Sequence, residues 1–262
     1  MLKNWTSLTT MDFSILDAMD PVAVLVAGSI EQHGPHLPLS TDSVIGEGLL
    51  EKSLDFVPSE IVILKLPSLC MGSSPEHKEF PGTISYSPEL LIENVVEIGS
   101  QVKECGVKRL VILNSHGGNS SALDIAAMRL RAEIQLLMVK VDYFRFPKPS
   151  QIDLPDSEWL YGLHGGALET SMMMHLKPEL VRMGELRNNA SWLKELAEGH
   201  RRLNKDRAVS FYWMASDLNP SGTVGDATLA SSEIGEELVE YYSKCFSEVI
   251  LDASEVDLSR LG

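Results

Sequence analysis

The sequence lacks an excess of positive charge and long apolar runs. Its 262 residues include 22 Lys and Arg against 37 Asp and Glu, a formal net charge of −15 at pH 7. That balance disfavours nucleic acids and anionic membrane surfaces as partners, because no surplus of cations can displace their counterions. No apolar run reaches the roughly 18 residues of a membrane-spanning helix, and no stretch is typical of a secretory signal. We therefore expect a soluble acidic enzyme, with the cytoplasm as its default location.

Cysteine is also scarce. Cys70, Cys105 and Cys245 are odd in number and widely spaced, which excludes a disulfide framework and a Cys-x-x-Cys metal pair. A hydrophobic content of 44% and a charged content of 23% are ordinary for a globular protein. The sequence contains no repeat, low-complexity tract or linker. We expect one domain over residues 1–262.

Apolar runs and helical patterns alternate along the chain. Buried strands are predicted for Val22 to Ala27, Ile61 to Leu66, Leu110 to Leu113 and Leu136 to Val141. Capping residues and apolar spacing predict helices for Thr41 to about Asp55, Ser87 to Gly106, Ser120 to about Ala132, Asn188 to about Asp206, and Ser231 to about Leu251. This β-α-β alternation predicts an α/β fold with an at least partly parallel sheet.

The segment richest in candidate metal ligands follows the first predicted strand. The stretch from Gly28 to Asp42 reads GSIEQHGPHLPLSTD and places Glu31, His33 and His36 in a constrained loop. Imidazoles and carboxylates at the carboxyl end of a strand are typical of a metal site, and without thiolates they suit Zn²⁺ or Mn²⁺. The sequence therefore predicts a divalent metal centre here.

Glu31 and His33 are two residues apart in an extended segment and would point to opposite sides. Each could serve one of two neighbouring metals, with Asp42 between them. Two metals about 3.5–4 Å apart would hold a bridging hydroxide and polarise a carbonyl oxygen. His116 follows another predicted strand and would reach the same edge of the sheet.

Residues 70–83 form a loop rich in Gly, Ser and Pro, and a loop this long is more often functional than not. Ser74, Glu76 and His77 on this loop are candidates to contact a substrate. Alternatively, these three side chains lie on the protein surface and have no role in binding.

Four motifs together resemble the creatininase (creatinine amidohydrolase) family. The first is EQHGPHLP at 31–38 with Asp42 eleven residues after Glu31. The others are NSHGGN at 114–119, HGGALETS at 164–171 and the weaker GTVGD at 222–226. The resemblance spans roughly residues 20 to 235. It implies a three-layer α/β/α sandwich with a mainly parallel sheet, and metal-dependent hydrolysis of a C–N amide bond in a small-molecule substrate that is cyclic, formylated or peptidyl. It also implies assembly as a homo-oligomer, commonly a hexamer.

The resemblance further implies two divalent metal ions per chain, Zn²⁺ and/or Mn²⁺, with Fe²⁺ as a third candidate. Glu31, Asp42 and His116 would hold one metal, and His33 with the bridging Asp42 would hold the other. Creatininase has a glutamate two residues after the histidine of the second motif, where this chain has Gly118. Glu169 is our candidate to supply the missing carboxylate, both as a ligand and in catalysis.

The resulting hypothesis is attack on the amide carbon by a metal-bound hydroxide, after which His164 protonates the leaving nitrogen. His36 is expected to orient a ligating carboxylate or to line the entrance of the pocket. A buried histidine that is hydrogen-bonded to the backbone is the alternative. Ser74, His77, Gly117 and Tyr161 are the expected substrate-binding positions.

The aromatic clamp that surrounds creatinine in creatininase is not reproduced, since Gly117 follows His116. A non-catalytic subunit with the same fold is the alternative function. A nucleotide-binding domain is disfavoured because no Gly-x-Gly-x-x-Gly turn follows the first strand.

Overall fold

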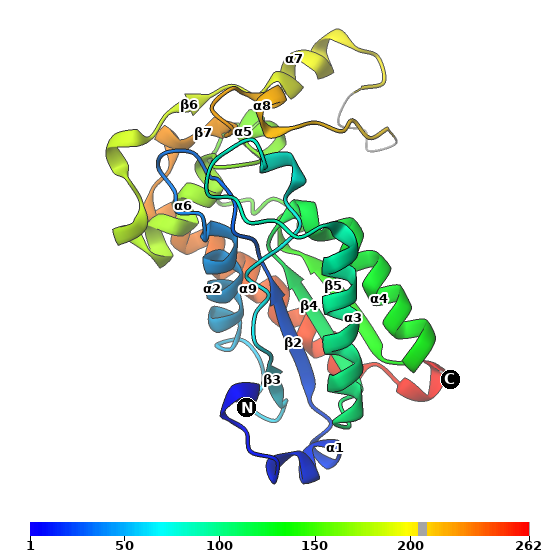
Figure 1. The fold of residues 1–262 in the computed structure, drawn as a ribbon. Helices are drawn as coiled ribbons and strands as arrows, with labels where there is room; N and C mark the ends of the chain where they lie inside the picture. The colour runs from blue at the N-terminus through cyan, green and yellow to red at the C-terminus, as the bar shows by residue number, and fades with distance from the viewer. Residues whose placement is uncertain (204–208, 262) are drawn as a thin grey trace.

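A computed structural model describes residues 1–203 and 209–261 and contains a five-stranded sheet (Figure 1). The strand order is β1-β3-β2-β4-β5, and every neighbouring pair is parallel. The strands are β1 (Leu2–Asn4), β2 (Val22–Ala27), β3 (Ile63–Lys65), β4 (Arg109–Asn114) and β5 (Leu137–Asp142). β2 and β4 are buried on both faces, which explains why they read as continuous apolar runs.

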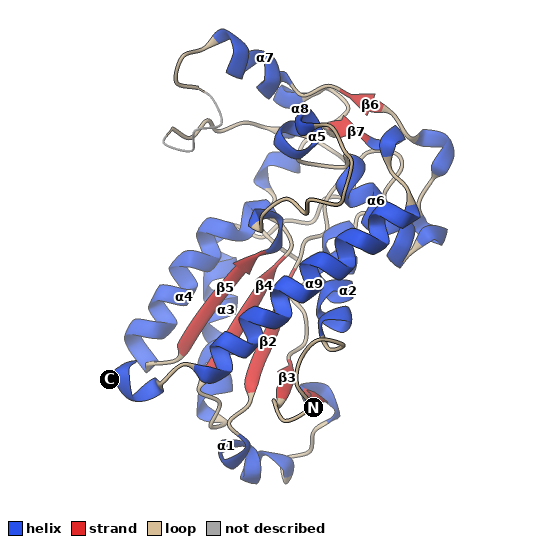
Figure 2. Ribbon diagram, turned by 180° about the vertical axis from the view of Figure 1, so that it is seen from behind, coloured by secondary structure: helices blue, strands red, loops and turns tan. Residues whose placement is uncertain are grey.

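Helices cover both faces of the sheet, so the expected three-layer α/β/α architecture is confirmed. Val22, Val24 and Val26 pack on one face against α2 (Thr41–Ser53), α6 (Ala167–Leu176) and α9 (Ser232–Glu255). Ala23, Leu25 and Ala27 pack on the other face against α3 (Pro88–Glu104) and α4 (Ser120–Ile134). Figure 2 shows α9 lying across the first of these faces.

The remaining short elements lie mostly beyond the carboxyl ends of the strands, in the upper part of Figure 1. They are α5 (Asp156–Tyr161), β6 (Asn188–Asn189), α7 (Trp192–Gly199), α8 (Ala215–Leu218) and β7 (Gly225–Asp226), whereas α1 (Leu16–Met19) lies at the opposite end. The helix predicted from 188 to 206 was wrong at both ends, because Asn188 pairs with Asp226 in an antiparallel ribbon and α7 ends at Gly199. Its last residues, 204–206, lie outside the described residues.

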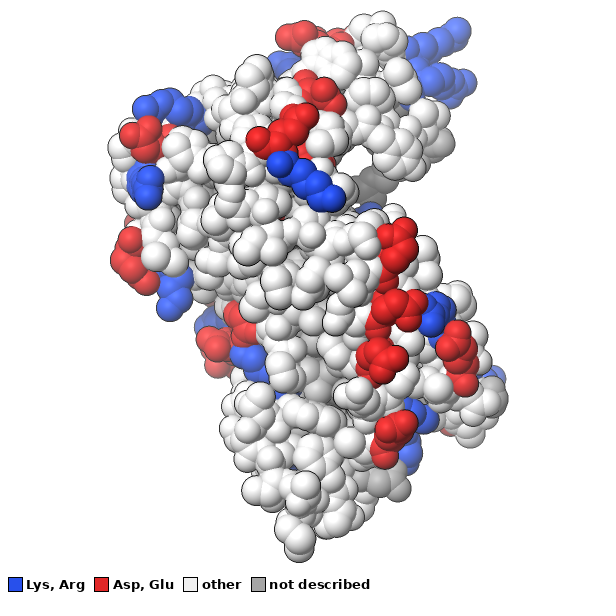
Figure 3. All heavy atoms as spheres, viewed as in Figure 1, with Lys and Arg blue, Asp and Glu red and all other residues white. Residues whose placement is uncertain are grey.

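Acidic side chains gather over α3 on the face shown in Figure 3. The exposed glutamates of this helix are Glu89, Glu93, Glu97 and Glu104. They occupy the side of α3 that faces away from the sheet, while Leu91 and Val95 are buried against it. Within the described ranges, no helix has the length and apolar character needed to cross a membrane.

Candidate metal centre

Two loops at the carboxyl edge of the sheet form the base of the site. Ala27 at the end of β2 is paired with Asn114 at the end of β4, so the loops that follow these strands start side by side. The loop after β2 carries Glu31 and His33 and enters α2 at Thr41, which places Asp42 in the first helical turn. There the helix dipole favours a carboxylate. The loop after β4 carries His116.

Asp42 lies between two histidines. Its Oδ2 is 3.3 Å from Nδ1 of His116, and its Oδ1 is 3.3 Å from Nε2 of His33. Glu31 extends the first side, with Oε2 3.2 Å from Nε2 of His116. Glu169 of α6 extends the second, with Oε2 3.8 Å from Nε2 of His33.

The donor set fits divalent cations. Glu31, Asp42 and His116 form one group whose ligand atoms lie within 4.8 Å of one another, and His33, His164 and Glu169 form a second. Oε2 of Glu31 and Nε2 of His33 are buried without a hydrogen-bond partner, a costly arrangement unless a cation binds them. Carboxylates and imidazoles are hard-to-borderline ligands.

The pKa values of the histidines and carboxylates in this cluster are shifted far from their ordinary values. Burial alone would lower the pKa of His33, but the negative charge of nearby Asp42 outweighs burial and raises the pKa to about 10. Burial would raise the pKa of Glu31, but the positive charge of His116 outweighs burial and lowers this pKa to about 2. His116 itself has a pKa raised well above its ordinary value by Glu31 and Asp42. Without cations, the protonated imidazole rings balance the negative charge of the carboxylates. A bound cation would displace these ring protons.

Asn119 fixes His116 against the neighbouring loops. Its side-chain amide donates to the carbonyl of Gly28 (3.0 Å), and its Oδ1 accepts from the backbone N–H of Ser73 (2.8 Å). Nε2 of His116 donates to the carbonyl of Ser73 at 3.0 Å. Because a carbonyl can only accept, Nδ1 is the ring atom left to bind a cation, and it faces Asp42.

His164 is held in a defined tautomer. Its Nε2 donates to the carbonyl of Gln32 at 2.6 Å, which leaves Nδ1 unprotonated 3.6 Å from Oε1 of Glu31. Burial, and then the charges of His33 and His77, hold the pKa of His164 well below its ordinary value. The ring is therefore neutral at pH 7, with a free lone pair toward the cluster.

Gln32 lies beside the candidate ligands, although we did not single it out from the sequence. Its Oε1 accepts from the backbone N–H of Gly34 (2.9 Å), and its Nε2 donates to the carbonyl of Gly222 (2.5 Å), so the amide has one orientation. The same Nε2 donates to Nδ1 of His77 at 2.9 Å. The neutral His77 ring then carries its proton on Nε2, which faces Oε1 of Glu31 at 3.4 Å. Burial lowers the pKa of His77 to about 4, so this form prevails at neutral pH.

His36 lies behind Glu169. Its Nε2 is 3.0 Å from the carbonyl of Gly165 and 3.1 Å from Oγ1 of Thr170. The backbone N–H of Gly165 in turn donates to Oε2 of Glu169 at 2.6 Å. Glu158, also missed from the sequence, accepts from the backbone N–H of Ala167 at 2.6 Å and fixes the start of the same helix.

The four expected substrate-binding residues lie in different places. Ser74 is buried, with Oγ 3.1 Å from Nε2 of His116, and His77 adjoins Glu31. Gly117 is exposed, and a side chain there would meet open space. Tyr161 lines an apolar hollow between α5 and α7 together with Leu193, Leu196 and Phe211, which are not ligand-type side chains. Its substrate role stays a prediction.

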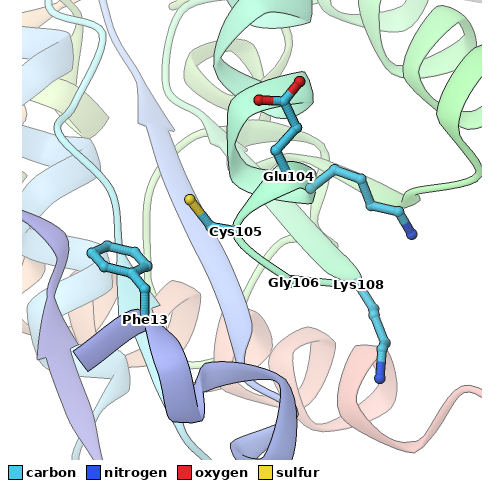
Figure 4. A pocket seen from close by; sticks show the side chains of 6 residues that line it. Phe13, Glu104, Cys105, Gly106 and Lys108 are labelled. Atoms are coloured by element: carbon cyan, nitrogen blue, oxygen red, sulfur yellow. The ribbon is translucent and has the colours of Figure 1, made fainter. Parts of the chain in front are cut away.

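A second hollow lies at the amino end of β4. Figure 4 shows Phe13, Glu104, Cys105, Gly106 and Lys108 around it. The chain enters β4 just after Lys108, whereas His116 follows the other end of the strand. This hollow is therefore remote from the ligand cluster.

Comparison with known proteins decides the family. The chain matches the family described as creatinine amidohydrolase over residues 6–250. The chain belongs to the creatininase family. Mycofactocin precursor peptide peptidase of Mycobacterium ulcerans (strain Agy99) is 31% identical over 255 residues, which cover 92% of this chain and 90% of that protein. Creatinine amidohydrolase of Pseudomonas putida is 34% identical over 179 residues, 63% of this chain and 67% of that one.

Solved creatininase structures share the fold. A mutant creatininase described as the Zn–Zn type is 26% identical, with a TM-score of 0.75, and the match covers 97% of this chain and 98% of that one. Together with the buried cluster of His, Asp and Glu, this likeness supports divalent metal binding by this creatininase-family chain.

Proposed function

We propose that this chain hydrolyses a C–N amide bond in a peptide or another small amide, using two divalent cations, Zn²⁺ or Mn²⁺. Membership of the creatininase family supports the hydrolase class. The observation that carries the proposal is the pair of unpartnered buried atoms, Oε2 of Glu31 and Nε2 of His33, on opposite sides of Asp42. They account for two cation positions that share one carboxylate.

The ligand assignment follows from these contacts. Glu31, Asp42 and His116 would hold one cation. His33 and Glu169 would hold the other together with Asp42, whose Oδ1 lies 3.3 Å from Nε2 of His33. When bound, such cations activate water and polarise the substrate carbonyl.

His164 supplies the proton transfer in this proposal. Its neutral ring presents Nδ1 to the cluster, so it can take a proton from the attacking water and pass it to the leaving nitrogen. The carbonyl of Gln32 holds the opposite nitrogen and keeps the ring in this tautomer. In this proposal the substrate carbonyl is polarised by the cations, and the Nε2–H group of His77 donates a hydrogen bond to its oxygen.

A peptidyl substrate is favoured over a small ring. A relative that is 31% identical over 92% of this chain is named as a peptide peptidase. Position 117, next to His116, bears no side chain and faces open space, which leaves room for an extended substrate. The creatinine amidohydrolase match covers 63% of this chain, and a cyclic amide is the second candidate.

Metal content and turnover test the function together. Purified protein should contain two Zn or Mn per chain by plasma mass spectrometry. It should hydrolyse at least one compound in a panel of acetylated alanine peptides, formamides and creatinine, and a chelator should abolish that activity. Protein without metal and without chelator-sensitive hydrolysis would support the non-catalytic alternative. The homo-oligomer, with a hexamer preferred, is tested by light scattering.

A further inference from the structure

Glu76 is a carboxylate beside the cluster that no metal ligand set requires. It lies in a short 3₁₀ turn, Pro75–His77, and its Oε1 is 3.6 Å from Nε2 of His116 and 3.9 Å from Nε2 of His77. Both separations exceed hydrogen-bond distance. Nε2 of His116 already donates to the carbonyl of Ser73. The carboxylate therefore retains acceptor capacity for another donor.

The carboxylate of Glu76 lies where a side chain at position 118 would otherwise project. A Cβ atom added to Gly118 would lie 2.7 Å from Oε1 of Glu76, 2.5 Å from Nε2 of His116 and against the backbone carbonyl of Ser73. A side chain at position 118 would therefore clash both with the 70–83 loop and with the His116 ring as they are placed here. The carboxylate beside His116 thus comes from the loop, about 40 residues away in sequence.

The turn that carries Glu76 is firmly held. The backbone N–H of Ser73 donates to Asn119, the backbone N–H of Ser74 donates to Oγ of Ser85 at 2.8 Å, and Tyr86 donates to the carbonyl of Gly72 at 2.8 Å. Glu76 is thereby fixed next to the cluster by hydrogen bonds on both sides of its loop, which is what a recognition residue needs.

Exposure separates Glu76 from the buried ligands. The side chains of Glu31 and Asp42 are 1% and 3% exposed, whereas that of Glu76 is 16% exposed. Glu169 is equally exposed, but its Oε2 already accepts from the backbone N–H of Gly165. Glu76 is therefore the accessible acceptor on the His116 side of the centre.

We propose that Glu76 is the specificity residue that accepts a hydrogen bond from the N–H of the scissile amide, and from the amine released. This inference rests on the proposed amide hydrolysis. An ionised carboxylate can only accept, and a charge-assisted bond to N–H is strong. An N–H on the leaving side distinguishes an amide from an ester of the same shape.

An amide and ester pair tests the assignment. N-acetyl-trialanine, and its analogue with an ester oxygen in place of the scissile N–H, are the first probes; the pair is rebuilt on whichever panel compound is turned over. Glu76→Gln should lower kcat/KM for the amide by roughly 10- to 100-fold, the range for a hydrogen bond to a charged group. It should change the ester by less than about threefold and leave the metal content of the purified protein unchanged.

Glu79→Gln is the matched control, because Glu79 is an exposed carboxylate of the same loop whose partner is Ser216. It should leave both substrates unaffected. Equal losses for amide and ester in Glu76→Gln would overturn the N–H assignment, and so would loss of metal, which would make Glu76 a ligand. Inactivity of the unmodified protein toward every panel compound would count against the proposed function, whereas an active parent and an unaltered Glu76→Gln would count against Glu76 alone.

Discussion

The loop after β2 and the 70–83 loop both reach the candidate site, but they differ in what they present. The first presents Glu31 and His33, which are almost fully buried, and ends at Asp42, equally buried at the start of α2. The second presents Glu76, which is partly open to solvent. Buried charges persist only when they are paired or bind a cation. We infer that the first loop holds cations and the second faces the substrate.

The largest effect is expected at Asp42, which links both halves of the buried cluster. Asp42→Ala removes the carboxylate between His33 and His116, so both cations should be lost. Activity should fall by a factor on the order of a thousand or more, because bound cations supply several kcal/mol of transition-state stabilisation. Plasma mass spectrometry and kcat/KM are the measurements. Asp55→Asn, at an exposed carboxylate just after the same helix, is the control. An Asp42→Ala protein with two metals per chain would refute the shared-ligand assignment.

His164 should separate metal binding from proton transfer. His164→Gln removes the unprotonated Nδ1 that faces Glu31, and kcat should drop by roughly 10²- to 10⁴-fold, the usual contribution of general acid–base catalysis. The metal content should change little, since Asp42 and Glu169 still contact His33. His175→Gln, on the far turn of α6, should be neutral. A fully active, metal-loaded His164→Gln protein would exclude His164 from the mechanism.

The two loops also show how far sequence reasoning reaches. Val22 to Ala27 is a strand with the predicted bounds because a continuous apolar run can only be buried. Glu31, His33 and Asp42 lie together because they are close in sequence and follow that strand. The role of Glu76 depends instead on Gly118 and on the path of a loop with little apolar patterning. β1 was missed for a related reason: its three residues lie at the sheet edge and contain no apolar run.

Protons and cations should compete at the buried cluster. In chelator-treated protein the His33 ring is charged at pH 7, because its pKa is raised to about 10 against an ordinary value of 6.5. A raised pKa in the folded state contributes stability that is complete below about pH 6.5 and disappears as the pH rises toward 10. The urea midpoint of the metal-free protein should therefore fall between pH 7 and pH 10.

Zinc provides the control for this pH effect. A cation binds the neutral ring and displaces its proton, so the metal-loaded protein should lose less stability over the same pH window. Equal pH dependence of the urea midpoints with and without zinc would show that His33 does not exchange its proton for a cation.

The smallest effect is expected from alanine substitutions of two neighbouring glycines. These variants test how the position of the 70–83 loop affects activity. Gly118→Ala places a methyl group against the carbonyl of Ser73 and 2.7 Å from Glu76, whereas Gly117→Ala places one in open space. The first change should push the 70–83 loop away from His116 and lower kcat/KM for the amide by about tenfold, the cost of weakening one charged hydrogen bond. The second should be nearly neutral. The methyl group of Gly118→Ala would also lie 2.5 Å from Nε2 of His116, so the metal content of both variants is measured beside kcat/KM. A Gly118→Ala protein that keeps its metals and loses amide turnover reports where the loop holds Glu76. If both variants behave alike for amide and ester, the position of that carboxylate does not govern substrate choice.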